Sequence, residues 1–223
     1  MRVRAVSPDL LVTELADTIA NLPIGPANGD DNDPGTGTAT WIRVAIDGAP
    51  ATHPDRWADA LTEPLRERGR AVLRVRAEDY LRPASLRLER GREDPDVLYE
   101  DWLDDAGLIR EVLEPLDPGG TGRVLPALWN ARTDRAHRAG YVTVPPGGVL
   151  VLSGSLLLGR WLPIDFAVHL ELSPAALARQ TPGDDRWTLP AYDRYAAEAV
   201  PAQAAQVVVR LDNPERPAVV EGS

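Results

Sequence analysis

The sequence predicts a three-layer α/β/α sandwich around a mostly parallel sheet of about five strands, with a small β-hairpin beside it. Three short segments are almost entirely apolar, as strands buried on both faces are: 149–152, 166–172 and 207–211. Segments with helical spacing of apolar residues alternate with these strands, which is typical of βαβ units and a parallel sheet. The 223 residues suffice for one domain of this kind.

A helix is expected near the N-terminus. Ser7 and Pro8 are residue types preferred at the N-cap and first position of a helix. Residues 1–22 are therefore predicted to form a helix packed on the domain, and residues 23–40, rich in Gly, Asp and Pro, a flexible loop or linker. The apolar stripe that supports the helix consists of Leu11, Leu15, Ile19 and Leu22.

The main domain is predicted to span residues 41–223, because no change in composition divides this stretch. Besides the three apolar strands, its expected elements are a strand over 41–48, a helix over 54–68, a strand over 71–75, a helix over 105–116, and an antiparallel ribbon formed by 123–130 and 140–144.

Composition excludes several classes of function. The net charge of −10 repels nucleic-acid backbones and anionic membrane surfaces, so neither is expected as a partner. The absence of cysteine excludes disulfides and thiolate chemistry, and the three histidines lie far apart, so no metal site is predicted. Without a signal-peptide pattern or an apolar run of membrane-spanning length, a cytoplasmic location is expected.

Residues 41–57 have the layout of a phosphate-binding P-loop, G-x-x-x-x-G-K-[ST], because a buried strand runs into Gly48 and a helix follows. Counted from Gly48, the second glycine of the motif is His53, the lysine is Pro54 and the hydroxyl residue is Asp55. Pro54 has neither a backbone N–H nor an ammonium group, and Asp55 places a carboxylate near the position of a phosphate. The scaffold is therefore predicted without its phosphate-binding chemistry.

A helix that starts without a ligand accounts for these residues. With His53 or Thr52 as N-cap and Pro54 at the first helical position, Asp55 lies in the first turn. Its carboxylate there takes the electrostatic role that phosphate has toward the helix dipole. On this interpretation the chain fills its own phosphate site; the alternative is a loop that binds ATP in an unusual way.

Four further motifs follow in order: R-x-E-D-Y-x-R-P from Arg76, R-G-R-E-D-P-D-x-x-Y from Arg90, T-D-R from Thr133 and D-N-P-E-R-P from Asp212. With the P-loop layout, this order resembles the bacterial uridine kinase-like branch of the P-loop nucleoside kinases, from about Trp41 to the C-terminus. The resemblance implies a P-loop NTPase fold and a nucleoside acceptor. This chain departs from the family again at Ser153-Gly154, where the family has an acidic residue before the glycine.

The resemblance implies an acceptor site after the second strand. Asp79 matches the carboxylate that takes the proton from the nucleoside 5′-hydroxyl as a general base. The segment from Arg90 matches the part that holds sugar and base, which makes substrate-binding residues of Arg92, Asp94, Asp96 and Tyr99. A solvated turn at Asp79 and a charged surface loop in place of the second segment are the structural alternatives.

The resemblance also assigns a base contact and a phosphate lid. Trp129 matches an aromatic residue that contacts the base, with core packing as the alternative. On the phosphate side the candidates are Gly48, Arg56, Arg179, Arg186 and Arg194. An i,i+4 ion pair with Glu198 is the alternative role for Arg194.

Three functional hypotheses follow. The first is a uridine kinase-like protein that keeps a nucleoside- or nucleotide-shaped pocket but is impaired in ATP-dependent phosphoryl transfer. The second is an active nucleoside kinase that takes its phosphate contacts from Arg56 and the lid arginines, with ATP and Mg²⁺ as its cofactors. The third is a non-catalytic interaction scaffold. A nucleoside or nucleotide is the expected small-molecule partner, and a homodimer is a candidate assembly.

Overall fold

The computed structural model describes residues 2–23 and 41–221. The predicted loop over 23–40 therefore lies, apart from Pro23, outside the described residues. The main sheet has seven strands in the order β1-β11-β10-β9-β2-β8-β3. These strands are β1 (Arg2–Ala5), β11 (Ala218–Glu221), β10 (Val207–Arg210), β9 (Phe166–Glu171), β2 (Ile42–Gly48), β8 (Val149–Gly154) and β3 (Val72–Arg76).

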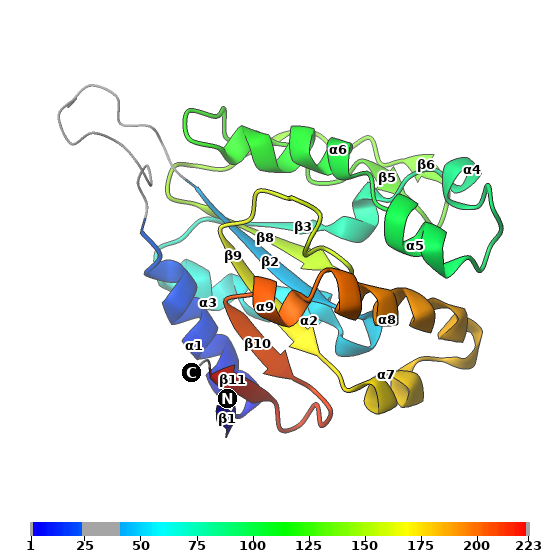
Figure 1. Cartoon of the computed structure of the whole chain (residues 1–223). Coiled ribbons are helices and arrows are strands. Elements are labelled where there is room, and N and C mark those ends of the chain that lie inside the picture. The colour runs from blue at the N-terminus through cyan, green and yellow to red at the C-terminus, as the bar shows by residue number, and fades with distance from the viewer. Residues whose placement is uncertain (1, 24–40, 222–223) are drawn as a thin grey trace.

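The five strands from β10 to β3 are parallel, as predicted, whereas β11 and β1 extend the sheet antiparallel at one edge. The strand at Arg2–Ala5 was not predicted, because four residues carry too little pattern to identify it. It pairs with the last described strand, so the two ends of the chain lie side by side (Figure 1).

Helices cover both faces of the sheet (Figure 1). The helices are α1 (Pro8–Ala20), α2 (Pro54–Ala60), α3 (Thr62–Glu67), α4 (Ala84–Arg87), α5 (Pro95–Asp101), α6 (Asp105–Leu108), α7 (Pro174–Gln180), α8 (Leu189–Glu198) and α9 (Pro201–Ala204). The three-layer α/β fold class is confirmed. The helix predicted over 54–68 is divided at Leu61 into α2 and α3, and the one over 105–116 continues from α6 as a π turn and a 3-10 turn.

Alternation along the strands builds two cores. On one side Val44, Ile46 and Val151 pack with α1, α2 and α3. On the other, Ala45 and Leu152 pack with α6, the turns after it and Tyr195 of α8. Since both faces are covered, the central strands must be apolar throughout, which is the pattern that predicted them.

The first helix begins as its sequence predicts. The Ser7 side chain accepts a hydrogen bond from the Leu10 backbone N–H at 3.3 Å, and Pro8 occupies the first helical position. Leu11, Leu15 and Ile19 are buried against the sheet. Helices α2, α5, α7 and α9 also begin with a proline, which explains part of the high proline content.

The predicted ribbon forms as two short two-stranded sheets. The pair β4 (Arg123–Val124) and β7 (Val142–Thr143) lies at its base, and β5 (Trp129–Asn130) pairs with β6 (Arg135–Ala136) around the turn. The turn at the tip places Asp134 at φ 52°, a left-handed conformation that Asp tolerates better than most residues.

A buried carboxylate joins the carboxyl end of β2 to its surroundings. Asp47 is fully buried, and its two oxygens accept hydrogen bonds from the Leu157 backbone N–H at 2.9 Å and the Tyr195 hydroxyl at 2.9 Å. His169 Nδ1 of β9 lies 2.7 Å from the same carboxylate. The Tyr195 hydroxyl also accepts from the Leu158 N–H at 3.0 Å. Burial, followed by the Asp47 charge, raises the pKa of Tyr195, so the hydroxyl stays a donor.

Replacing Tyr195 tests this buried network. We expect Tyr195→Phe to lower the free energy of unfolding by about 1–3 kcal/mol, because a buried carboxylate and a backbone N–H each lose a partner. The measurement is urea unfolding followed by tryptophan fluorescence.

Tyr141→Phe is the matched control, because the Tyr141 hydroxyl also donates to a carboxylate (Glu111, 2.8 Å) but its residue is 53% exposed. We expect this control to change stability by less than about 0.5 kcal/mol. Equal losses in the two variants would show that the Asp47 network adds nothing specific.

Candidate functional site

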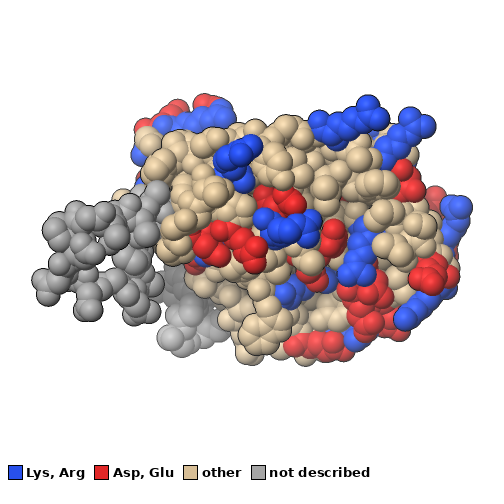
Figure 2. Space-filling model, turned by 90° about the horizontal axis from the view of Figure 1, so that it is seen from above, with Lys and Arg blue, Asp and Glu red and all other residues tan. Residues whose placement is uncertain are grey.

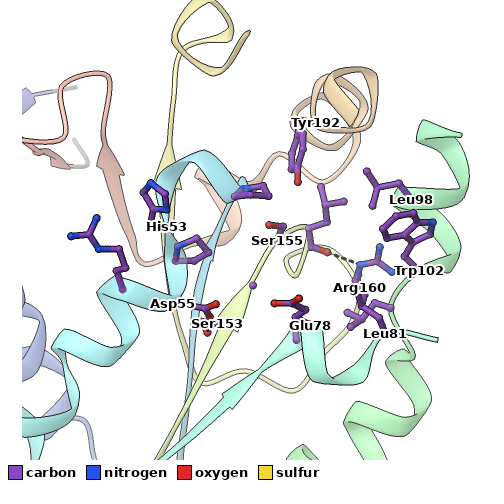
Figure 3. A pocket seen from close by; sticks show the side chains of 17 residues that line it. His53, Asp55, Glu78, Leu81, Leu98, Trp102, Ser153, Ser155, Arg160 and Tyr192 are labelled. Carbon is purple, nitrogen blue, oxygen red and sulfur yellow. Dashed lines mark hydrogen bonds between the residues drawn. The ribbon is translucent and has the colours of Figure 1, made fainter. Parts of the chain in front are cut away.

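A cavity of about 540 Å³ opens at the carboxyl ends of β2, β8 and β3. The chain leaves β2 toward β3 on one side, and the connection from β8 to β9 runs to the other side of β2. Ligands of open α/β sheets bind where the connections change direction in this way. We call it the strand-end cavity (Figure 3). It is lined by Pro50, His53, Pro54, Asp55, Arg56, Ala77, Glu78, Leu81, Leu98, Trp102, Leu103, Ser153, Gly154, Ser155, Leu156, Arg160 and Tyr192.

One wall is the loop from Gly48 to Asp55. Gly48 ends β2 so closely packed that a Cβ there would lie 2.4 Å from Thr52 Oγ1 and 2.8 Å from Leu170 Cβ. The chain then makes a 3-10 turn, Pro50–Thr52, and passes through His53 at φ 54° before α2 begins at Pro54. A glycine at this position of the P-loop motif would adopt that left-handed conformation without the steric cost of a Cβ.

The N-cap of α2 is His53, one of the two residues predicted for it. Its side chain makes no capping hydrogen bond, and Thr52 Oγ1 donates back to the Ala49 carbonyl at 2.7 Å. Pro54 occupies the first helical position and Asp55 the first turn, as predicted. The helix therefore starts through proline geometry rather than through a cap.

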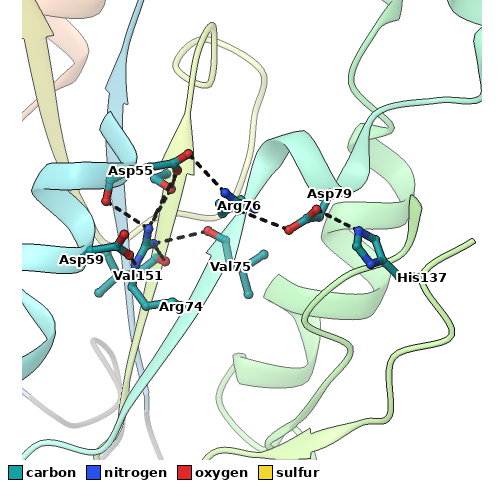
Figure 4. Close-up of polar contacts among 9 residues, drawn as sticks. Asp55, Asp59, Arg74, Val75, Arg76, Asp79, His137 and Val151 are labelled. Atoms are coloured by element: carbon teal, nitrogen blue, oxygen red, sulfur yellow. Dashed lines mark hydrogen bonds and ion pairs between the residues drawn. The ribbon is translucent and has the colours of Figure 1, made fainter. Parts of the chain in front are cut away.

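Asp55 is tied to the neighbouring strand ends. Ser153 Oγ, at the end of β8, donates a hydrogen bond to Asp55 Oδ1. The guanidinium groups of Arg74 and Arg76, both on β3, lie 3.9 Å and 3.8 Å from its carboxylate (Figure 4). The Asp55 carboxylate is therefore a negative charge at the position where the P-loop motif has its hydroxyl residue. It lies next to Ser153 at the end of β8.

A second carboxylate, Glu78, also lines the cavity, and its residue is exposed. It lies in the 3-10 turn Ala77–Tyr80 that follows β3. Within the described part of the chain, its side chain makes no hydrogen bond or ion pair, and Figure 3 shows it facing the same space as Asp55 and Ser153. An unpaired carboxylate beside a cavity is available to a ligand as an acceptor or as a base.

Hydroxyl groups and an apolar wall complete the cavity. Ser155 Oγ donates to the Gly48 carbonyl at 2.8 Å, and burial raises the pKa of the Tyr192 hydroxyl. Leu98 and Trp102, on and just after α5, form the wall opposite the carboxylates (Figure 3). A ligand with one polar and one apolar end fits this arrangement.

The cavity's inner guanidinium, Arg160, is held by the protein. It donates to the Leu156 carbonyl at 2.5 Å, to Asp105 Oδ2 at 3.1 Å and to the Tyr99 carbonyl. Its side chain is 11% exposed. Burial raises the pKa of the Asp105 carboxyl, and the charge of Arg160 opposes that rise. Arg160 thus connects the loop after β8 to α5 and α6.

The structure places the predicted base Asp79 outside the cavity. Its carboxylate lies 3.0 Å from His137 Nε2 and 3.6 Å from Arg76 Nε, toward the ribbon (Figure 4). Its neighbour Glu78 lines the cavity instead. Both carboxylates belong to one motif, and only the 3-10 turn decides which of them faces the cavity. The catalytic role of Asp79 stays a prediction.

The side chains of the predicted substrate-binding segment contact other residues of the protein. Asp94 is the N-cap of α5 and accepts from the backbone N–H groups of Asp96 and Val97 at 3.0 and 3.1 Å. Asp96 pairs with Arg194 at 3.0 Å. Tyr99 packs beneath Arg194, whose guanidinium lies 4.8 Å from the ring centroid. None of these residues, nor the exposed Arg92, lines the strand-end cavity.

The predicted base contact, Trp129, lies in β5, where its Nε1 donates to Asp134 at 3.0 Å, away from the cavity.

Among the lid candidates, Arg179 lies in the last turn of α7 and Arg186 lies in the turn Gly183–Thr188, and both are exposed. Arg194 pairs with Glu198 at 2.7 Å, its predicted alternative role. Bonds to Glu198, Glu100 and Asp96 raise its pKa.

Gly48 and Arg56 are the predicted site residues that remain at the loop. Arg56 and His53 line both the strand-end cavity and a smaller cavity of about 270 Å³ between α1 and α2. They therefore lie on the ridge between the two cavities, where both side chains are exposed. Sequence reasoning missed Glu78, Ser155, Arg160 and Tyr192, which come from three separate segments and share no motif.

The described residues contain no cluster of three or more His, Cys, Asp or Glu side chains suited to a metal ion. Among them no helix is both long and apolar enough to cross a membrane. On the face seen in Figure 2, acidic and basic side chains are interspersed with uncharged surface.

No family model and no curated protein matches the sequence. Solved structures share its fold. A candidate uridine kinase from Bacillus stearothermophilus has a TM-score of 0.67 at 21% identity, over 88% of this chain and 96% of that one. A candidate fructose transport system kinase from Silicibacter sp. TM1040 has a TM-score of 0.55 at 19% identity, over 90% and 95%. The chain therefore has the fold of uridine kinase-like P-loop kinases, and these identities establish the fold alone.

Proposed function

We propose that this protein binds a small hydroxyl compound of nucleoside size in the strand-end cavity and is impaired in phosphoryl transfer from ATP. The observation that carries the proposal is a cavity of about 540 Å³ beside a loop in which the Asp55 carboxylate accepts a hydrogen bond from Ser153. That volume lies within the range of small-molecule sites. The Ser155 and Tyr192 hydroxyls and the Glu78 carboxylate provide partners for ligand hydroxyl groups.

The residues at the loop do not fit a magnesium–nucleotide complex. A P-loop supplies backbone N–H groups, a lysine and a hydroxyl that binds the metal. Here Pro54 offers neither N–H nor ammonium, and Asp55 accepts a hydrogen bond from Ser153 where the γ-phosphate and metal side would lie. A carboxylate at that position repels phosphate oxygens. The proposal therefore includes no step that uses ATP.

A binding titration tests the proposal directly. We expect calorimetry to detect binding of uridine or another nucleoside to the whole protein, because the cavity has an apolar wall, hydroxyl groups and the carboxylate of Glu78. Addition of Mg-ATP is expected to leave that affinity unchanged within about twofold, since the loop lacks a phosphate site. Failure to bind any nucleoside would contradict the proposal.

If no nucleoside binds, the third hypothesis, a non-catalytic interaction scaffold, is the one to test. One surface feature favours it: Trp161, in the loop after β8, is 96% exposed. Sedimentation of the wild type and Trp161→Ala would then test self-association, including the candidate homodimer.

An active kinase is the second candidate function, and Glu78 is the observation that favours it. Its unpaired carboxylate faces the cavity and is placed to take the proton of a ligand hydroxyl. Phosphate contacts would then have to come from Arg56 at the cavity rim and from the exposed Arg179 and Arg186.

The kinase hypothesis makes a residue-specific prediction. If uridine is phosphorylated by ATP, Glu78→Gln should lower kcat by about 10²-fold or more, whereas Asp79→Asn should have a smaller effect because Asp79 faces His137. A coupled assay of ADP release measures both. A larger loss of kcat in Asp79→Asn than in Glu78→Gln would identify Asp79 as the base. If the wild type transfers no phosphate from ATP to uridine, the kinase hypothesis is wrong.

Rebuilding the motif tests whether the loop alone prevents nucleotide binding. The variant His53→Gly, Pro54→Lys, Asp55→Thr restores the glycine, the ammonium, the N–H and the hydroxyl, so Mg-ATP binding is expected to appear in calorimetry.

Asp59→Thr is the control, because Asp59 lies on the same helix and pairs with Arg74 at 2.9 Å but does not line the cavity. A folded triple variant without Mg-ATP binding would show that other residues also block the site.

A further inference from the structure

We propose that the strand-end cavity selects a ligand whose polar end is a protonated amine, or is uncharged, and that it discriminates against phosphate esters. The inference rests on the proposed binding function and names the charge class of the ligand. Glu78 is the residue that sets this preference, with Asp55 in support.

The first support is the state of Glu78. It lines the cavity as an exposed side chain, without a hydrogen bond or ion pair in the described part of the chain. A carboxylate accepts hydrogen bonds and cannot donate them, so a ligand ammonium or hydroxyl group satisfies it, whereas a phosphate oxygen repels it.

The second support is the incomplete pairing of Asp55. Asp55, Asp59 and Asp79 form one chain of ion pairs with Arg74 and Arg76 (Figure 4). Asp55 therefore shares these two guanidinium groups with two carboxylates that do not line the cavity. The Asp55–guanidinium distances of 3.8 and 3.9 Å are longer than hydrogen bonds, so its compensation is partial.

Two arginines, Arg56 and Arg160, also line the cavity. Arg160 already donates to two carbonyls and to Asp105, which neutralises it, and its side chain is 11% exposed. Arg56 and His53 lie on the ridge shared with the smaller cavity. Near Ser153 and Ser155, the charged groups that face the cavity are Asp55 and Glu78.

The apolar wall orients the ligand. Leu98 and Trp102 face the carboxylates across the cavity (Figure 3), so a heterocyclic or aliphatic body packs against them. The polar end of the same ligand then points to Glu78. For a nucleoside this end is the 5′ position, and replacing its hydroxyl by an amine adds a positive charge without changing the body.

A matched ligand series tests the inference by calorimetry on the whole protein: uridine, 5′-amino-5′-deoxyuridine and UMP. We expect the amine to bind about tenfold more tightly than uridine, and UMP about tenfold more weakly. In Glu78→Gln the preference for the amine should fall to within about threefold. Asp59→Asn, from the same ion-pair chain but outside the cavity lining, should retain the wild-type preference.

The outcomes separate the two proposals. If UMP binds as tightly as uridine, if the amine has no advantage, or if Glu78→Gln keeps the full preference, the charge selection is overturned while ligand binding stands. If none of the three compounds binds, the proposed function fails and the selection falls with it. The order of the three affinities in the wild type tests the charge selection even if Glu78→Gln does not fold.

Discussion

The buried carboxylate of Asp47 is the interaction on which the site depends. A carboxylate removed from water is costly unless donors surround it, and here the donors come from three other segments: the loop after β8, β9 and α8. Because these partners must converge on the end of β2, they also fix where that strand stops. Gly48 follows at once, packed so tightly that no side chain fits. The loop that lines the cavity therefore starts from a tightly packed strand end.

In the loop after Gly48, a carboxylate of the chain itself lies at the start of the helix. Asp55 lies in the first turn of α2, where negative charge is favoured, and accepts a hydrogen bond from Ser153 of the neighbouring strand. The same carboxylate that lies at the helix start also lines the cavity, so under the proposed function the stability of the loop and the choice of ligand depend on one residue.

The segment from Arg90 is used to hold two helices together. Asp94 caps α5, and Asp96 and Glu100 pair with Arg194 of α8, so these carboxylates join the two helices that flank the cavity. Arg160 contributes in the same way from inside, through the Tyr99 carbonyl and Asp105. Their charges are used within the protein, which leaves Glu78 as the unpaired acidic group in the cavity lining.

The sequence by itself determined the fold class, the parallel strands and the start of the first helix, because apolar runs, helical spacing and a Ser-Pro cap are local signals. It also located the unusual loop, since a motif is read by counting from Gly48. The short strand Arg2–Ala5 was beyond its reach, because pairing with the other end of the chain defines that strand.

Only the tertiary structure decided which charged side chains face the cavity. Glu78 and Asp79 are adjacent in one motif, and the 3-10 turn after β3 directs the first to the cavity and the second to His137. Arg160 and Tyr192 reach the same space from distant segments. The direction of a side chain depends on turn geometry and on partners far away in the chain, and neither is encoded in the spacing of residue types.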